Sequence, residues 1–393
     1  MRFHLSLLIA CFSFLGLCSS SFATTNVVKV GLFWKNEPTA VMISPVIGSY
    51  EVFADGKRLD DLSREGLRLL MLTASGNQIE LKSLKKKLGK FSRVEFRRKS
   101  WGCNIRIKAS TPSHPAKVFY DNLMVRSNGK LKIVNQVYIE HYIAGVVESE
   151  AGSKEPLEYY KVQAIICRTY ALSNLRRHAG EGFHVCDKVH CQVYHHRSTT
   201  NPDIVKAVNA TKGLVIVDSE IELITAAFSS NCGGTTCNSE SVWTNPLPYL
   251  RSVNDTFCLE ENHARWEKTV SRTAWLNYLE KHWNYPVNDT AYQKMVVNYC
   301  PEHRAFKLLP DHPHIPLKII RRDWKLQSAY FNIKEEGDSI RFVGRGYGHG
   351  VGLCQEGAMR MAKEGVPYNQ ILHHYYTDVH LINLAVIDFF RSD

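Results

Sequence analysis

Five glycines alternate with other residues over the nine positions from Gly344 to Gly352, a run that forms neither a helix nor an ordinary strand. Glycine reaches positive φ angles at little cost and lets the backbone approach a ligand closely. Because Tyr347 and His349 stand between these glycines, the run predicts a loop that forms the wall of a site. A helix from about 355 to 363 is expected to follow. A structural turn ahead of that helix is the alternative interpretation.

The first 23 residues have the pattern of a secretory signal peptide, with an apolar run from Leu5 to Leu17 behind Arg2 and small residues up to Ala23. The apolar run is shorter than the roughly 20 residues that a membrane-spanning helix needs, although an uncleaved anchor is an alternative. No later stretch is long and apolar enough to cross a bilayer. We therefore expect an exported protein without a membrane span, in the periplasm or on the cell-wall side of the cytoplasmic membrane.

The composition is that of a globular protein, with 44% hydrophobic and 22% charged residues and a formal net charge of +11. The positive charge suits an anionic partner such as a cell wall. The basic residues are scattered and carry no nucleic-acid-binding motif, so nucleic acid is not expected as a partner. Export permits disulfides, and Cys232 with Cys237 or Cys258 with Cys300 are candidate pairs whose connectivity the sequence leaves open.

Short alternating and β-branched runs between residues 27 and 132 predict antiparallel strands, with turns at Asp55-Gly56 and Asn77. The last of these strands is expected to end at Val134-Asn135. The pattern then changes, because Ile139, Tyr142, Ile143 and Val146 follow the spacing of an amphipathic helix. These runs predict a sheet-rich N-terminal region that leads into a helix.

A second helix is expected to begin near Pro156 and to end with the positive turn 176–178, before Gly180 and Gly182. Residues 213–217 and 223–228 predict a hairpin, and so do 328–334 and 339–343. Together these elements predict an α+β fold with mixed, largely antiparallel β-sheets and a central pair of helices.

Glu150 is the candidate catalytic residue. At 100° per residue it falls on the apolar stripe of the first helix, whereas Glu148 is expected to point to the opposite face and to solvent. Burial and the negative end of the helix dipole would both raise the pKa of Glu150 toward the range of a general acid. A solvated carboxylate at a helix end is the alternative.

A compact group of metal-ligand residues follows the second helix. Thiolate and imidazole are the ligands that tetrahedral zinc prefers, and the loop holds them close together in the chain. The members of this group are His178, His184, Cys186, His190 and Cys191. A disulfide between Cys186 and Cys191 is the alternative.

The glycine run continues to Ala358 as GRGYGHGVGLCQEGA, which resembles the C-terminal signature of the stage II sporulation protein D (SpoIID) family, also called the LytB amidase-enhancer family. Three further segments match the same family in the same order. They are 134–150, 157–172, and 229–235 together with Trp243 and 248–250. The resemblance therefore extends over most of the chain after the N-terminal hundred residues.

The resemblance implies a peptidoglycan lytic transglycosylase with Glu150 as the catalytic glutamate. Such enzymes cleave the bond between N-acetylmuramic acid and N-acetylglucosamine without water and close a 1,6-anhydro ring. The implied substrate is a glycan strand already stripped of its stem peptides, and an N-acetylmuramoyl-L-alanine amidase is the implied functional partner. A non-catalytic wall-binding module that enhances such an amidase is the second hypothesis, and a zinc-dependent hydrolase is the third.

The resemblance also implies a structural zinc site in the ligand-rich loop. Cys186, His190 and Cys191 match the core of a Cys2His2 zinc site that some members of the family carry. For the fourth ligand, His178 fits the family order, while His184 is closer in the sequence. The candidate substrate-binding residues are Tyr347, His349, Ser229, Ser230 and Gln355.

The expected organisation has a signal peptide at 1–23 and a β-rich region at 24–130. A SpoIID-like catalytic core with the metal loop is expected at 131–261, and an insertion or small lobe with one helix, which carries Trp266, Trp275 and Trp283, at 262–326. Residues 327–393 are expected to add a hairpin, the glycine-rich loop and a helix that complete the core. Whether sporulation, cell division or another form of wall remodelling is served stays open.

Overall fold

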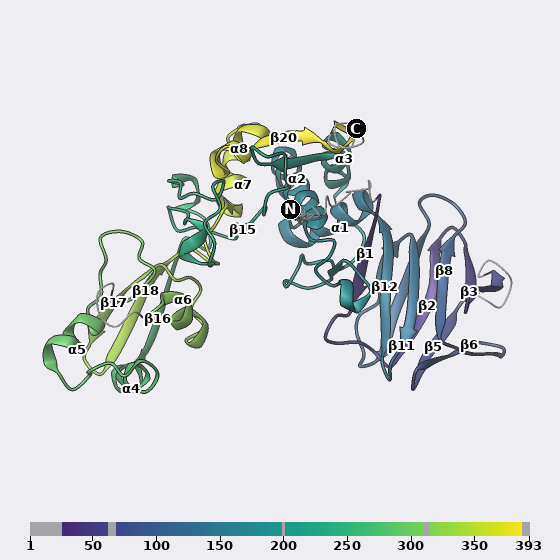
Figure 1. The fold of residues 1–393 in the computed structure, drawn as a ribbon, viewed down its shortest axis with the longest axis horizontal. Coiled ribbons are helices and arrows are strands. Elements are labelled where there is room, and N and C mark those ends of the chain that lie inside the picture. Colours follow the sequence, from purple (N-terminus) through teal and green to yellow (C-terminus); the bar gives the residue numbers. More distant parts are fainter. Residues whose placement is uncertain (1–25, 62–67, 199–200, 310–314, 387–393) are drawn as a thin grey trace, which may run out of the picture.

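The computed structural model describes residues 26–61, 68–198, 201–309 and 315–386, and the predicted signal peptide at 1–23 lies outside them. Figure 1 shows an elongated molecule, with a strand-rich part at one end, a group of helices in the middle and a smaller unit of helices and strands at the other end. Helices combine with mostly antiparallel sheets, so the predicted α+β class is confirmed. Among the helices of the described ranges, none combines the length and apolar character that a bilayer-spanning helix needs.

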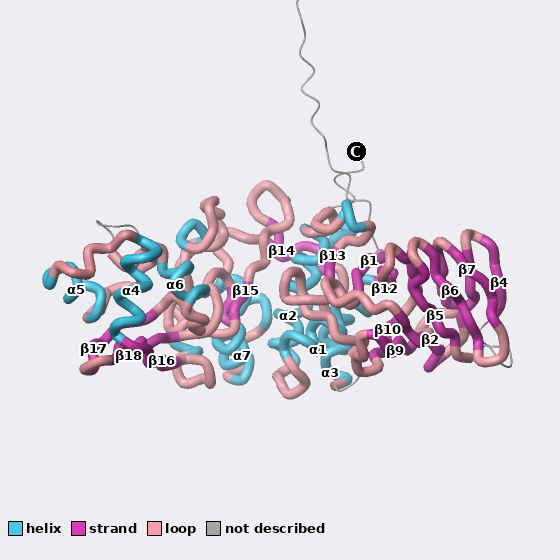
Figure 2. The backbone as a smooth tube through the Cα atoms, turned by 90° about the horizontal axis from the view of Figure 1, so that it is seen from below, coloured by secondary structure: helices cyan, strands magenta, loops and turns pink. Residues whose placement is uncertain are grey.

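The N-terminal part is a sandwich of two sheets (Figure 2). In the first sheet the strand order is β13 (Val185–Cys186), β1 (Val27–Leu32), β12 (Leu131–Tyr138), β11 (Asn122–Ser127), β8 (Arg93–Arg98), β3 (Tyr50–Ala54), β4 (Lys57–Asp61). In the second it is β10 (Lys117–Tyr120), β9 (Asn104–Thr111), β2 (Ala40–Ile47), β5 (Leu70–Ser75), β6 (Gln78–Ser83), β7 (Lys87–Phe91).

Alternation of side chains holds this sandwich together. Val28 and Val30 of β1 and Ile43 of β2 are fully buried and belong to one apolar core, while their neighbours Val27 and Lys29 are exposed. The expected turns are present between β3 and β4 and between β5 and β6. The strand β12 runs on to Tyr138, so the predicted end at 134–135 was wrong; Asn135, at the predicted break, is fully buried and its side-chain amide donates to the backbone carbonyls of Tyr120 and Asn122.

The predicted helix pair lies in the middle of the molecule, as α1 (Ile139–Ala151) and α2 (Leu157–Ser173). A buried ion pair locks the two helices together, since Arg168 Nη2 lies 2.6 Å from Glu140 Oε2 and Arg168 Nε donates to the same carboxylate. The helix α2 ends at Ser173 and not at residue 178, because the side chains of Ser173 and Asn174 both donate to the carbonyl oxygen of Tyr170.

Short elements surround the central helices. They are η1 (Ala179–Glu181), α3 (Pro202–Ala210), β14 (Leu214–Val217), β15 (Phe228–Ser229), η2 (Ser239–Ser241), η3 (Thr256–Cys258), β19 (Leu353–Cys354), α7 (Gln355–Lys363), α8 (Tyr368–Tyr375) and β20 (His380–Asn383). The predicted hairpin of 213–217 with 223–228 was largely wrong. β14 pairs with β20 from the far end of the chain, and β15 pairs in parallel with β19. Only a single bridge, Val217 to Leu223, joins the two predicted strands.

The smaller unit has an apolar core of its own around the fully buried Trp275. It contains β16 (Arg265–Ser271), α4 (Arg272–Trp283), α5 (Thr290–Val297), α6 (Leu317–Asp323), β17 (Phe331–Glu336) and β18 (Ser339–Arg345). More than the one expected helix is present, and Trp266 lies on a strand. The predicted hairpin is confirmed as β17–β18. However, β16 pairs with β18 as a third strand, and the apolar residues of the hairpin pack into the core of this smaller unit. The domain boundaries expected above stay predictions.

Candidate active site and metal centre

Glu150 lies in the last turn of α1 and is half-buried. The backbone N–H of Val193 donates a hydrogen bond of 2.7 Å to Glu150 Oε1. Burial raises the pKa of Glu150, and the hydrogen bond from Val193 opposes this shift without cancelling it. A carboxyl group with a raised pKa suits proton donation close to neutral pH.

The prediction that Glu148 points to solvent was wrong. Its side chain is buried, and its Oε2 accepts a hydrogen bond of 2.9 Å from the hydroxyl group of Ser198. The segment 193–198 crosses this face of α1, and it can do so because Gly145 has no side chain; a Cβ there would lie 2.6 Å from Tyr194 Cε2. Helical phase alone therefore did not separate the two carboxylates. What separates them is that Glu150 lines a cavity.

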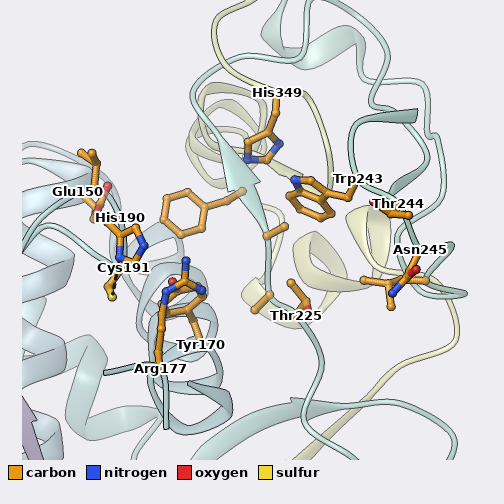
Figure 3. A pocket seen from close by; sticks show the side chains of 15 residues that line it. Glu150, Tyr170, Arg177, His190, Cys191, Thr225, Trp243, Thr244, Asn245 and His349 are labelled. Carbon is orange, nitrogen blue, oxygen red and sulfur yellow. Dashed lines mark hydrogen bonds between the residues drawn. The ribbon is translucent and has the colours of Figure 1, made fainter. Parts of the chain in front are cut away.

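A cavity of about 850 Å3 lies beside Glu150 (Figure 3), a volume typical of sites for small organic ligands. The metal-ligand loop and the end of α2 form one side of it, and the segments around β15, Trp243 and the glycine-rich loop form the other. Its lining residues are Glu150, Tyr170, Arg177, Val189, His190, Cys191, Thr225, Ala226, Ala227, Phe228, Trp243, Thr244, Asn245, Leu247 and His349.

His349 is the residue that the glycine-rich loop contributes to this cavity, across from Glu150 in Figure 3. Burial, together with the charges of Arg321 and Arg304, lowers the pKa of His349 to about 4, so the ring is neutral at neutral pH. The backbone N–H of Val351 donates to His349 Nδ1 at 3.0 Å. The remaining ring proton is therefore on Nε2, which makes that atom a hydrogen-bond donor.

Four of the predicted metal-ligand residues come together on the other side of the cavity. One ligand atom from each of His178, Cys186, His190 and Cys191 lies within 4.8 Å of all the others. His178 Nε2 is 3.3 Å from Cys191 Sγ, and His190 Nδ1 is 3.8 Å from Cys186 Sγ. His184 lies outside this group, because its Nδ1 accepts a hydrogen bond from the backbone N–H of Lys29.

The surroundings of these residues fit a bound metal ion. His178 Nδ1 lies 2.6 Å from Glu181 Oε1, so the Nε2 atom that faces the thiols is free to be a ligand. Trp34 donates to the other oxygen of Glu181 and packs against the ring of His190 at 4.7 Å. Two thiols and two imidazoles arranged in this way form a donor set that could hold a metal ion, and both cysteines carry free thiols.

The loop that carries the metal ligands also reaches Glu150. Gln192, between Cys191 and Val193, is fully buried and anchors the loop to both central helices: its side chain accepts from Tyr142 of α1 and donates to the carbonyl oxygen of Cys167 of α2. The metal ligands, the anchor and the hydrogen bond to Glu150 thus follow one another along the chain.

The other predicted substrate-binding residues do not line the cavity. Tyr347 is exposed and contacts His263, whereas Ser229 and Gln355 are buried behind the wall. Ser230 accepts through its backbone carbonyl from the backbone N–H of Glu356. A role in ligand binding for Tyr347, Ser229, Ser230 and Gln355 stays a prediction.

Several cavity residues were not predicted as site residues, among them Arg177, Tyr170 and Trp243. Arg177 was interpreted as the positive end of a helix, yet it lies beyond the end of α2 and beside the metal group. Trp243 packs against His349, with ring centroids 5.5 Å apart. The family resemblance, in which Trp243 is one of the matching positions, is the signal that could have identified it.

Comparison with known protein families matches residues 127–217 to the family described as "Stage II sporulation protein". This range includes α1, α2 and the metal-ligand loop.

Several known proteins are similar to the chain over longer ranges. An uncharacterised protein of Brachyspira hyodysenteriae is 31% identical over 271 residues, which cover 67% of this chain and 72% of that protein. Stage II sporulation protein D of Bacillus subtilis is 30% identical over 258 residues, which cover 62% of this chain and 74% of that protein. The amidase enhancer of Bacillus subtilis is 27% identical over 287 residues, which cover 60% of this chain but only 39% of that protein.

Proposed function

The chain belongs to the stage II sporulation protein D family, and we propose that it is a lytic transglycosylase acting on peptidoglycan glycan strands stripped of their peptides. The observation that carries the proposal is Glu150, a half-buried carboxyl group with a raised pKa on the wall of a ligand-sized cavity. A role in cell-wall metabolism agrees with the names of the relatives.

A single carboxyl group is sufficient for this reaction. Protonated Glu150 donates its proton to the glycosidic oxygen, and the bond between N-acetylmuramic acid and N-acetylglucosamine breaks. The resulting carboxylate takes the proton from the 6-hydroxyl of the same muramic acid, whose oxygen closes the 1,6-anhydro ring. Ordinary glycosidases use a pair of carboxyl groups, whereas here the substrate supplies the nucleophile, so no second acid is needed beside Glu150.

The other cavity residues suit a sugar ligand. Trp243 and Phe228 offer aromatic faces for the apolar sides of sugar rings, and His349 adds a neutral imidazole ring to the same wall. Removal of the stem peptide leaves a free lactyl carboxylate on muramic acid. Arg177 is the cation on the wall that could pair with this carboxylate, which accounts for a preference for denuded strands.

Zinc is the ion proposed for the group of His178, Cys186, His190 and Cys191. Bound there, it would cross-link the loop to η1 and so hold the backbone that bonds Glu150. Four protein ligands leave no position for a reactive water, which argues against the alternative of a zinc-dependent hydrolase.

The second candidate is a non-catalytic module that enhances an amidase, and the name of one Bacillus relative favours it. In either case an N-acetylmuramoyl-L-alanine amidase is the proposed functional partner, because that activity produces denuded strands. The signal-like N-terminus supports export to the wall side of the membrane.

Product analysis separates the candidates. Purified protein would be incubated with denuded glycan strands and the products identified by mass spectrometry. Glycan fragments with 1,6-anhydro ends and no stem peptides are expected. Reducing ends would indicate attack by water. Intact strands together with a stimulated amidase would favour the enhancer.

A further inference from the structure

A second group of metal-ligand residues lies behind the opposite wall of the cavity. It consists of Cys232, Asp255, Cys258 and Cys354, all at most 1% exposed, and one ligand atom from each lies within 4.8 Å of all the others. Cys232 follows β15, Asp255 precedes η3, Cys258 is the last residue of η3, and Cys354 ends β19. The group therefore joins three segments that are far apart in the sequence.

The spacing of these atoms fits a tetrahedral ion. Cys232 Sγ lies 3.5 Å from Cys258 Sγ and 3.3 Å from Asp255 Oδ2. With a zinc–sulfur distance of about 2.3 Å, two thiolates of a tetrahedral site are about 3.8 Å apart, close to the separation seen here.

The backbone around the group is arranged to stabilise negative sulfur. The N–H groups of Cys232 and Gly357 both point at Cys354 Sγ, at 3.2 and 3.4 Å. The hydroxyl of Tyr375 donates to Asp255 Oδ2 at 3.0 Å. Amide donors aimed at buried sulfur are a feature of metal–thiolate sites, where they offset the charge of the ligands.

From this geometry we propose that Cys232, Asp255, Cys258 and Cys354 bind a structural Zn²⁺ ion. Three thiolates and one carboxylate around Zn²⁺ carry the same net charge as a four-cysteine zinc site, and all four positions are filled by protein. A bound cation would compensate the charge that these buried ligands carry when they are ionised. A disulfide between Cys232 and Cys258 is the alternative, and it would use only two of the four side chains that meet here.

The proposed ion would support the cavity wall that faces Glu150. Asn231, next to Cys232, pairs with Tyr347 of the glycine-rich loop. The strand that Cys354 ends pairs with β15, whose Phe228 lines the cavity. Each of the two metal centres would then hold one wall of the same cavity. Binding of an ion at this second centre does not depend on which reaction the protein catalyses.

Metal analysis of the full-length protein, expressed in zinc-containing medium, tests this proposal. The wild type is expected to hold two zinc ions per chain by native mass spectrometry and elemental analysis. Cys191→Ser is expected to keep one ion, and Cys258→Ser is expected to lose one. Cys237→Ser is the matched control, because Cys237 is a buried thiol only five residues after Cys232 and donates to the carbonyl of His349 instead.

X-ray absorption keeps the test informative if a variant does not fold. In Cys191→Ser the zinc spectrum should show three sulfur ligands and one oxygen ligand, and in the wild type it should show more than two sulfurs per zinc on average. A wild type with one zinc, all of which is lost in Cys191→Ser, would overturn the proposal. So would iron in place of zinc, or a mapped Cys232–Cys258 disulfide.

Discussion

The backbone N–H of Val193 donates a 2.7 Å hydrogen bond to Glu150 Oε1, and Val193 lies two residues after the metal-ligand residue Cys191. The group that is proposed to transfer protons is therefore oriented by the segment that the metal would fix. This hydrogen bond favours the charged form of Glu150, while burial favours the neutral form. A carboxyl group that must first donate a proton and then accept one benefits from such a balance.

Replacing Glu150 by glutamine keeps the shape of the side chain and its bond from Val193 but removes the proton that titrates. We expect the Glu150→Gln variant to lose about 10²- to 10⁴-fold in the rate of glycan cleavage, with binding of denuded strands retained. Cleavage is measured from the 1,6-anhydro products.

Glu148→Gln is the control for this change, because Glu148 lies on the same helix but outside the cavity. It should cleave glycan at the wild-type rate per folded molecule. Full activity of Glu150→Gln, or a loss confined to Glu148→Gln, would show that the wrong carboxylate has been identified.

The raised pKa of Glu150 also predicts a link between pH and stability. A group whose pKa is higher in the folded than in the unfolded protein contributes stability below its unfolded pKa, about 4.3 for glutamate, and loses this contribution as pH rises through the folded value. At neutral pH the native protein therefore bears the cost of a buried charge at Glu150. Glu150→Gln should have the higher midpoint of thermal unfolding at pH 7, and the difference should vanish near pH 4. An equal difference at both pH values would contradict the assignment.

Glu181 is expected to tune the metal affinity of the first centre without being a ligand. It accepts from His178 Nδ1 and so directs Nε2 toward the thiols. Glu181→Ala should lower zinc affinity at this centre by about 10- to 100-fold, measured by competition with a chelator. Glu220→Ala, an exposed carboxylate in another turn, is the control. Unchanged affinity in Glu181→Ala would mean that the histidine is held by packing alone.

Arg177 is predicted to select strands that lack peptides. Arg177→Gln should lower kcat/KM on denuded glycan by about tenfold, the size of one charge-assisted hydrogen bond, and should change cleavage of peptide-bearing strands little. Arg176→Gln is matched to it, because Arg176 is also exposed but does not line the cavity. Equal losses of kcat/KM on both substrates would mean that Arg177 contributes only positive charge to the cavity and does not select strands that lack peptides.

Local patterns predicted the parts of the site that lie close together in the sequence. The stripe from Ile139 to Val146 is local, and so is the loop with Cys186, His190 and Cys191; all were recognisable from spacing and residue type. For the fourth ligand only the family resemblance favoured His178 over His184, since the distance of His178 to the thiols depends on where α2 ends.

Contacts between distant segments were not predictable in this way. Glu148 is buried because the segment 193–198 crosses a helix face that periodicity alone assigns to solvent. Cys232 appeared to be a partner for Cys237, but the backbone of Cys237 bonds Gly350, and Cys232 meets Cys258 and Cys354 instead. The sequence of one segment does not indicate which cysteine of a distant segment its own cysteine will contact.

The glycine-rich loop offers a test in which strain and steric contact can be separated. Gly348 has φ +113°, and a Cβ there would lie 2.7 Å from Ser229 Cβ; Gly337, in the β17–β18 turn, has φ +59° and open space around it. At both positions the positive φ angle makes alanine destabilising by about 1–3 kcal/mol, but only in Gly348→Ala does the new Cβ also collide with Ser229. We expect Gly348→Ala to have the larger fall in unfolding midpoint.

Activity should separate the same two variants, since the adjacent residue His349 lines the cavity and moves with its loop. Gly348→Ala should also lose glycan cleavage per folded molecule, whereas Gly337→Ala should keep it. The contact with Ser229 means that the substitution also destabilises the fold itself. If the two variants match in stability and activity, the loop has no close approach at Gly348 and serves only as a turn.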